Sequence, residues 1–171
     1  MDAFSASLMA NKREIIFAPT VYKFQTFAQM AEEFKLNERD VVLTNEFIYT
    51  PFMKDLGLKC HYVFQEKFGA GEPSEAMIQT MYDAIPYDSY DRVIAVGGGA
   101  IMDLCKLLGC KRPDTVHNLY FKRFPVVHEK DVIAIPTTCG TGSECTNISV
   151  AIVKDEKDGV LTGGETKLGL V

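Results

Sequence analysis

Three consecutive glycines stand where the clearest strand pattern of the sequence meets a helix pattern. They follow the apolar run of residues 92–96, and apolar residues at helical spacing begin directly after them. Glycines let the backbone approach a pyrophosphate closely, and the amides and dipole at a helix N-terminus attract the same anion. The candidate pyrophosphate-binding residues are therefore Gly97, Gly98, Gly99, Ala100, Ile101, Met102 and Asp103.

The same glycines have a structural explanation, because a tight turn between a strand and a helix can require a positive φ. Their spacing also differs from the common GxGxxG fingerprint, so the specificity of that motif does not apply here. Asp103 falls in the expected first helical turn, where a carboxylate is favoured even without a ligand. Taken alone, this motif leaves a binding turn and a structural turn open.

A second loop, rich in hydroxyl groups and glycine, follows the apolar run of residues 132–135. In open α/β sheets, ligands bind beyond the carboxyl ends of the strands, where such hydroxyl and amide groups can reach them. Thr141 followed by Glu144 also fits a capping box, so part of this loop could simply begin a helix. Because both loops follow strands, binding is favoured over turn formation alone. The candidate binding residues of this loop are Thr137, Thr138, Thr141 and Thr146.

The elements that must position these loops alternate between short apolar runs and segments of helical periodicity. Strands are expected at residues 15–18, 40–44, 60–64, 92–96 and 132–135, with helices after Thr20, Asn45, Pro73 and the glycines. This alternation is typical of a doubly wound, Rossmann-like α/β domain with a mostly parallel sheet. Residues 147–153 alternate in polarity and lead into a polar turn ending at Gly159, which predicts a small β-hairpin near the C-terminal end. Residues 111–130 are expected to form a loop.

The composition excludes several classes of function. Apolar residues make up 47% and charged residues 24% of the 171 residues, with a net charge of −5, so there is no basic footprint for nucleic acid or an anionic membrane surface. There is no signal-peptide pattern and no apolar run of the roughly 20 residues that a membrane helix needs. The five cysteines form no CxxC pair, which indicates free thiols and a cytoplasmic protein.

The loop sequences VGGGAIMDLCK and IPTTCGTGSECT resemble, in order and separation, the two nucleotide-binding signatures of the iron-containing (group III) alcohol dehydrogenases. The second signature is quite specific, whereas the first is shared with relatives of that family. The likeness covers residues 1–171 as the N-terminal dinucleotide-binding domain. Asn45, the first loop and the TKLGL segment near the C-terminal end look most similar to the 4-hydroxybutyrate dehydrogenase branch.

This resemblance implies an NAD(P)-dependent oxidoreductase that converts a small primary alcohol, such as 4-hydroxybutyrate, to its aldehyde. It also implies a homo-oligomer in the full-length protein. The pyrophosphate would lie on the glycine loop as far as Asp103, and the threonines of the second loop would line the adenine and nicotinamide sides of the cleft. Val150 would lie near the nicotinamide, and Lys167 near the nicotinamide ribose.

Two positions depart from the pattern of the family. The family often has Asp at the end of the second strand, where its carboxylate binds the adenosine ribose and repels a 2′-phosphate. Asn45 can still bind the ribose but has no repelling charge, so NAD is favoured while NADP stays possible. Glu72 stands before Pro73 where the family tends to have Asn, which leaves the adenine contact from that turn open.

No metal ligand and no catalytic residue is expected in this chain. The family holds a divalent metal, typically iron, on one Asp and three His of an all-helical C-terminal domain. The histidines His61, His117 and His128 are far apart in sequence and form no HxxxH pair. Because the sequence ends on an apolar run, we expect a longer protein to continue with the helical domain, and the 171 residues alone to be inactive.

Three alternatives remain at this stage. The chain could come from a dehydroquinate-synthase-like enzyme or a glycerol-dehydrogenase-like enzyme, since both share the first signature. It could also be a non-catalytic nucleotide-binding module. The apolar end of the sequence argues against the module, because a finished domain rarely exposes such a run.

Overall fold

A parallel four-stranded sheet organises the chain. The computed structural model describes residues 20–157 and 160–169, with side chains described from residue 20 to residue 154. The sheet has the order β2-β1-β3-β4, and each neighbouring pair is parallel. Its strands are β1 (Asp40–Thr44), β2 (His61–Phe64), β3 (Arg92–Gly97) and β4 (Asp131–Pro136). The expected strand at residues 15–18 lies outside the described residues.

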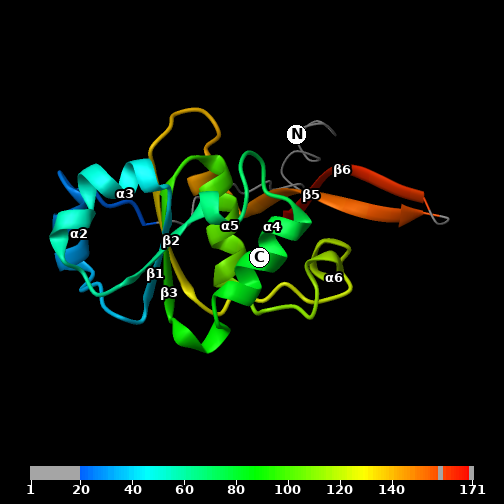
Figure 1. The fold of residues 1–171 in the computed structure, drawn as a ribbon, viewed down its shortest axis with the longest axis horizontal. Helices are drawn as coiled ribbons and strands as arrows, with labels where there is room; N and C mark the ends of the chain where they lie inside the picture. The colour runs from blue at the N-terminus through cyan, green and yellow to red at the C-terminus, as the bar shows by residue number, and fades with distance from the viewer. Residues whose placement is uncertain (1–19, 158–159, 170–171) are drawn as a thin grey trace, which may run out of the picture.

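Helices cover both faces of this sheet, so the predicted doubly wound α/β fold is confirmed (Figure 1). One face carries α2 (Phe27–Glu33) and α3 (Glu46–Phe52), which pack on Val42, Ile94 and Val96. The other face carries α4 (Glu75–Ala84), α5 (Gly99–Gly109) and α6 (Val116–Tyr120), which pack on the oppositely directed side chains of β1 and β3. Single 3₁₀ turns lie at η1 (Lys54–Leu56), η2 (Gln65–Lys67), η3 (Tyr87–Ser89) and η4 (Ser143–Cys145).

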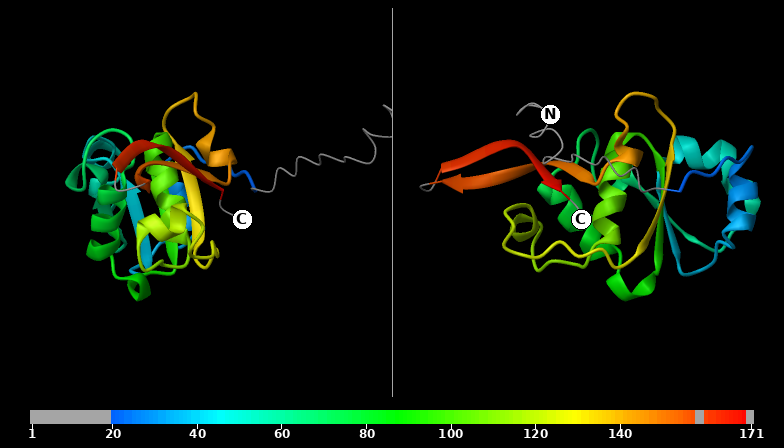
Figure 2. Two further views of the ribbon diagram at one scale, coloured as in Figure 1. Left: turned by 90° about the vertical axis from the view of Figure 1, so that its right-hand side faces the viewer. Right: turned by 180° about the vertical axis from the view of Figure 1, so that it is seen from behind.

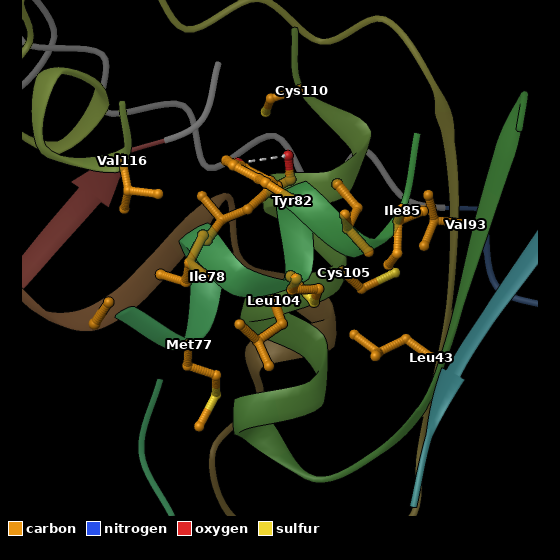
Figure 3. Packing of buried hydrophobic residues seen from close by; sticks show 14 of the residues in the cluster. Leu43, Met77, Ile78, Tyr82, Ile85, Val93, Leu104, Cys105, Cys110 and Val116 are labelled. Atoms are coloured by element: carbon orange, nitrogen blue, oxygen red, sulfur yellow. Dashed lines mark hydrogen bonds between the residues drawn. The ribbon is translucent and has the colours of Figure 1, made fainter. Parts of the chain in front are cut away.

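Helix α5 forms the centre of the larger core. Leu104 and Cys105 are at most 1% exposed and lie between helix α4 and the sheet (Figure 3). Leu107 and Leu108 are fully buried as well, so the helix is covered on nearly all sides. Burial of each large side chain contributes about 1.5–3 kcal/mol to folding. The helix that follows the glycine loop is therefore held firmly by the core.

The strand order places a topological switch point between β1 and β3. The chain moves from β1 outward to β2 and then crosses back over β1 to form β3. In open α/β sheets, ligands bind in the crevice at the carboxyl ends of the strands at such a point. Thr44 Oγ1 donates to the carbonyl of Val96 at 2.8 Å, which ties the two strand ends together. The site is thus expected between the residues that follow β1 and β3.

The predicted β-hairpin near the C-terminal end is present, and it extends away from the sheet (Figure 2). It consists of the antiparallel strands β5 (Ile148–Lys157) and β6 (Val160–Gly169). The predicted polar turn at residues 154–159 was wrong in its extent, because residues 154–157 continue β5. The amide of Ile152 donates to the carbonyl of Pro73 at 2.8 Å, and the hydroxyls of Tyr120 and Ser149 are 3.1 Å apart. These bonds attach the hairpin to the α4 and α6 side of the domain.

Two expectations about helix boundaries were wrong. Thr20 does not cap the first described helix, because α2 begins at Phe27 after Thr26, whose hydroxyl accepts the amide of Gln29 at 3.2 Å. Residues 111–130 are not entirely loop, since they contain α6. There Thr115 accepts the amide of Asn118 at 3.1 Å. Both helices begin at a threonine cap, a local signal that apolar periodicity does not report.

Helical periodicity predicts an apolar face of Ala76, Met77, Met81, Ala84 and Ile85 on α4, and this prediction was only partly right. Met77 and Met81 are buried as expected, whereas Ala76 and Ala84 are exposed. Their places in the core are taken by Ile78 and Tyr82, which lie on the same side as the two methionines. Larger side chains thus define the buried face of this helix.

Candidate functional site

The two predicted loops meet at the carboxyl ends of neighbouring strands. The glycine loop follows β3, the threonine loop follows β4, and both stand at the same end of the sheet (Figure 1). The amide of Thr137 donates to the carbonyl of Gly97 at 3.0 Å, which carries the β3–β4 pairing into the loops. A Cβ placed on Gly98 would lie 3.4 Å from Thr138 Oγ1, and one on Gly99 would lie 2.9 Å from Thr141 Cγ2. The loops are therefore in direct contact.

Gly97 and Gly99 are required by space, whereas a Cβ on Gly98 would make only ordinary contact, and backbone conformation requires none of the three glycines. None of them has a positive φ, and Gly98 has an ordinary extended conformation with φ −83° and ψ −172°. A structural turn that needs a positive φ therefore does not explain the motif. The second loop differs, because Gly140 and Gly142 have φ values of 148° and 62° with open space around them. There the glycines serve the conformation of the loop.

The N-terminus of α5 presents amide groups at the crevice. The helix starts at Gly99, and its N-cap is Gly98, which has no side chain to bind the first amides. The opening amides of a helix have no acceptor within the helix, and the helix dipole adds partial positive charge there. With the hydroxyls of Thr138 and Thr141 beside them, these groups form a donor set suited to an anion such as a pyrophosphate.

Asp103 is placed differently from our expectation. It is the fifth residue of α5 and not part of the first turn, so the helix dipole does not explain it. The side chain is buried, and its carboxylate accepts from Ser143 Oγ, from Lys106 Nζ at 3.1 Å and from the amide of Val150 at 3.0 Å. The carboxylate thus links α5 to both the threonine loop and the hairpin. A contact of Asp103 with a cofactor stays a prediction.

Lys106 is a residue of this site that the sequence analysis missed. Its ammonium group is enclosed by four oxygen atoms, and the side chain is 12% exposed. The acceptors are Asp103 Oδ1 at 3.1 Å, Ser143 Oγ at 2.6 Å, Thr146 Oγ1 at 3.3 Å and the carbonyl of Ile148 at 2.7 Å. The lysine therefore positions Thr146, which is one of the predicted cofactor contacts. Its i, i+3 spacing from Asp103 in the first loop sequence was the available signal.

The alternative that Thr141 and Glu144 form a capping box was wrong. The loop forms only the 3₁₀ turn η4, whose N-cap is Gly142 in the left-handed conformation. Thr141 Oγ1 accepts the amide of Ser143 at 3.3 Å instead, within the loop. Since no longer helix follows, the hydroxyl-rich segment is a loop in its own right and not the start of a helix.

The remaining predicted residues lie around this centre. Asn45 is half-buried at the N-cap of α3, and its side chain makes no capping hydrogen bond. Val150 is half-buried in β5 and pairs in register with Lys167 of β6. The side chain of Lys167 lies outside the described side chains, so its predicted approach to the nicotinamide ribose stays a prediction.

A broad depression of about 2140 Å³ runs from these loops across the open side of β4. It exceeds the roughly 300–1,000 Å³ of a typical small-molecule pocket, so it is a surface groove and not a pocket shaped for one ligand. Its wall contains most of the predicted residues, namely Asn45, Gly98, Gly99, Ala100, Ile101, Met102, Thr137, Thr138 and Thr146. Gly97, Asp103, Thr141 and Val150 are not part of this wall.

The described residues supply no metal centre. Within residues 20–154, no group of three or more His, Cys, Asp and Glu side chains is arranged to hold a metal ion. His61 and His128 are exposed, while His117 Nδ1 lies 3.8 Å from Glu75. No helix in the described part of the chain is long and apolar enough to cross a membrane.

The cysteines divide into a buried and an exposed group. Cys60, Cys105 and Cys110 are buried, whereas Cys139 and Cys145 are exposed in or beside the threonine loop. Burial raises the pKa of the Cys105 thiol and raises that of Cys110 to about 11. All five are free thiols.

Comparison with known proteins agrees with this arrangement. The profile of the iron-containing alcohol dehydrogenases matches residues 18–166. The chain belongs to the iron-containing alcohol dehydrogenase family. It is 47% identical over 137 residues to 4-hydroxybutyrate dehydrogenase of Clostridium kluyveri, a match that covers 80% of this chain and 37% of that protein. The mitochondrial hydroxyacid-oxoacid transhydrogenase of Rattus norvegicus is 37% identical over 87 residues, covering 46% of this chain and 19% of that protein.

Solved structures share the fold of this iron-containing alcohol dehydrogenase chain. An iron-containing alcohol dehydrogenase of Thermotoga maritima superposes with a TM-score of 0.60 at 25% identity, over 88% of this chain and 45% of that one. A sulfoacetaldehyde reductase of Bifidobacterium kashiwanohense, solved in complex with NAD⁺, superposes with a TM-score of 0.62 at 18% identity. That match covers 89% of this chain and 44% of the reductase. The chain thus spans less than half the length of these relatives.

Proposed function

We propose that this chain binds NAD(P) and forms the cofactor-binding half of an oxidoreductase that interconverts a small primary alcohol and its aldehyde. The observation that carries the proposal is the N-terminus of α5, whose free amides lie beside the threonine loop at the switch point of the sheet. Membership of the iron-containing alcohol dehydrogenase family supports the same activity.

In this proposal, the amides from Gly98 onward hold the pyrophosphate, and the hydroxyls of the threonine loop bind the two nucleoside parts. A Cβ on Gly99 would lie only 2.9 Å from Thr141 Cγ2 and one on Gly98 would touch Thr138 at 3.4 Å, so the two loops form a narrow, continuous cradle of donors. Asp103 and Lys106 hold the threonine loop against α5. When bound, NAD(P) supplies the acceptor for the hydride that leaves the alcohol carbon.

The alcohol must also lose its hydroxyl proton, and the described residues offer no metal site for that step. In the family this role belongs to a divalent metal. This chain matches only 37% of the length of 4-hydroxybutyrate dehydrogenase, and we propose that the metal ligands belong to the part of the enzyme that the match does not cover. The isolated chain would then bind the cofactor without turnover.

The substrate that the comparisons favour is 4-hydroxybutyrate, with succinate semialdehyde as its product. The 47% identity to 4-hydroxybutyrate dehydrogenase over 80% of this chain supports that choice. By analogy with the family, we also propose a homo-oligomeric and cytoplasmic full-length enzyme.

Calorimetric titration of the purified chain with NAD, and in parallel with NADP, tests the cofactor proposal. Gly98→Val and Gly99→Val should abolish binding, because the added side chains enter the space beside Thr138 and Thr141. Ala76→Val is a matched control, since Ala76 is exposed on α4. A folded chain that binds neither cofactor, or binding that survives both glycine changes, would contradict the proposal.

A further inference from the structure

Glu66 places a carboxylate directly beside Asn45. Its Oε1 accepts a hydrogen bond from the backbone amide of Glu46 at 3.1 Å, at the first residue of α3. Asn45 is the N-cap of this helix, and its own side chain makes no capping bond. The group that binds the start of α3 therefore comes from the turn η2, twenty residues further along the chain.

The pairing of β1 with β2 explains this approach. Thr44 at the end of β1 is in register with Phe64 at the end of β2, so both chains leave the sheet side by side. Glu66 lies two residues beyond Phe64, just as Glu46 lies two residues beyond Thr44. Asn45 and Gln65 both line the groove into which the glycine loop faces. The carboxylate thus stands at the border of the candidate cofactor site.

Dinucleotide-binding sheets commonly place an acidic side chain at the end of the strand next to the glycine loop, where it accepts hydrogen bonds from the adenosine ribose. Such a charge also opposes the 2′-phosphate of NADP. In this chain β1, a neighbour of β3, is followed by the neutral Asn45. We propose that Glu66 supplies the missing negative charge from the adjacent strand end and thereby makes the site select NAD over NADP. This inference rests on the proposed function, since it concerns the same site.

The carboxylate of Glu66 takes no part in the salt bridges of the described side chains. Among the side chains described for residues 20–154, no lysine, arginine or histidine forms a salt bridge with it. The neighbouring Lys67 is directed to the ring of Phe64, with its Nζ 5.3 Å from the ring centroid. Glu46, in the first turn of α3, adds a second carboxylate close by. The carboxylates of Glu66 and Glu46 thus both belong to the border of the site.

Glu66 also has a structural role, because it caps α3. Loss of that cap alone would weaken the binding of NAD and the binding of NADP to the same degree, since the two cofactors share the adenosine and pyrophosphate groups. Loss of the charge would instead raise the affinity for NADP relative to the affinity for NAD. The ratio of the two dissociation constants therefore separates the roles.

The test measures both dissociation constants by calorimetry for the wild-type chain and for Glu66→Gln. We expect Glu66→Gln to lower the ratio of Kd for NADP to Kd for NAD about tenfold, and the wild-type ratio to shrink as ionic strength rises. Glu66→Asp retains the charge and should retain the preference. The double variant Asn45→Asp with Glu66→Gln should restore it, because the charge returns from the end of β1.

Glu38→Gln is the matched control, since it removes the same charge from an exposed position at the opposite end of β1. It should leave the ratio unchanged. If Glu66→Gln still binds NAD and its ratio of Kd for NADP to Kd for NAD is unchanged, the inference is wrong while the proposed function stands. The same conclusion follows if Glu38→Gln changes that ratio as much as Glu66→Gln does. A folded wild-type chain that binds neither cofactor would overturn the proposed function and this inference with it.

Discussion

The backbone amide of Val150 donates to Asp103 Oδ2 at 3.0 Å, so a carboxylate of α5 fixes the start of the hairpin strand β5. The same carboxylate accepts from Lys106 and Ser143, and the carbonyl of Asp103 accepts from Ser149 Oγ at 3.1 Å. Helix α5, the threonine loop and the hairpin are therefore one connected unit. The position of each predicted cofactor contact in the loop depends on this unit.

Asp103→Ala should destabilise the chain and weaken NAD binding together. The change removes the carboxylate that balances the charge of the buried Lys106 ammonium and takes the acceptor from the amide of Val150, at a cost of about 3 kcal/mol. Urea unfolding gives the stability change, and titration gives the affinity. Asp83→Ala, on the exposed side of α4, should change stability by less than about 0.5 kcal/mol. Equal stability of the two variants would show that the network around Asp103 contributes little.

Alanine at the first two glycines should separate folding from binding. A Cβ at Gly97 would lie 2.6 Å from Cγ1 of the buried Ile101, so Gly97→Ala should cost about 1–3 kcal/mol of stability. A Cβ at Gly98 would lie 3.4 Å from Thr138 Oγ1, and its φ of −83° suits alanine. Gly98→Ala should therefore keep the unfolding temperature and lower NAD affinity. Equal melting temperatures for the two variants would contradict this reading of the loop.

The two arginine–aspartate pairs at the amino end of the sheet should contribute differently to the stability of the fold. Asp40 is 2% exposed and bonds Arg92 through both oxygens at 2.8 Å, whereas the pair of Arg39 and Asp91 is exposed to solvent. Asp40→Ala leaves the half-buried guanidinium unpaired and should cost about 3 kcal/mol. Asp91→Ala should have a much smaller effect, because exposed pairs contribute little. Chemical denaturation of both variants at one ionic strength checks this; similar losses would contradict it.

Thiol labelling should divide the five cysteines into two classes. Thiolate is the reactive form, and burial raises the pKa of Cys110 to about 11, so at pH 8 this thiol stays protonated as well as inaccessible. Cys105 and Cys60 are buried in the same way. Ellman's reagent should therefore react rapidly with Cys139 and Cys145 in the folded chain, and with the other three only after unfolding. Saturating NAD should slow the reaction of Cys145, which lines the groove. Rapid reaction of all five in the folded chain would be inconsistent with the core described here.

Periodicity and turn chemistry were sufficient to predict the parallel sheet and its two loops. Apolar runs identify strands such as β3, and glycines after them indicate the end of the sheet at which ligands bind. The contacts of Lys106 and Glu66 could not be predicted in this way. Lys106 reaches residues about 40 positions away, and Glu66 reaches Glu46 only because β1 and β2 pair in a particular register. Such contacts depend on strand order and register, which a local pattern does not contain.

Helix boundaries show the same limit on a smaller scale. Asp103 was assigned to the first turn because the helix was expected to begin after the glycines, whereas the structure begins it at Gly99. A shift of this size moves a side chain from the helix N-terminus to the buried face of the helix. The prediction of a chemical role for Asp103 thus depended on the boundary more than on the residue itself.

The parallel sheet also determines how this chain folds in time. Every pairing within it joins distant segments, as when Val41 meets both His61 and Val93, and Val93 meets Val132. Closing such long loops costs chain entropy before any contact compensates for it, so sheets of this kind fold slowly for their size. The cradle needs the ends of β3 and β4 in register. Cofactor affinity should therefore appear only in the last kinetic phase of refolding, well after the helices have formed.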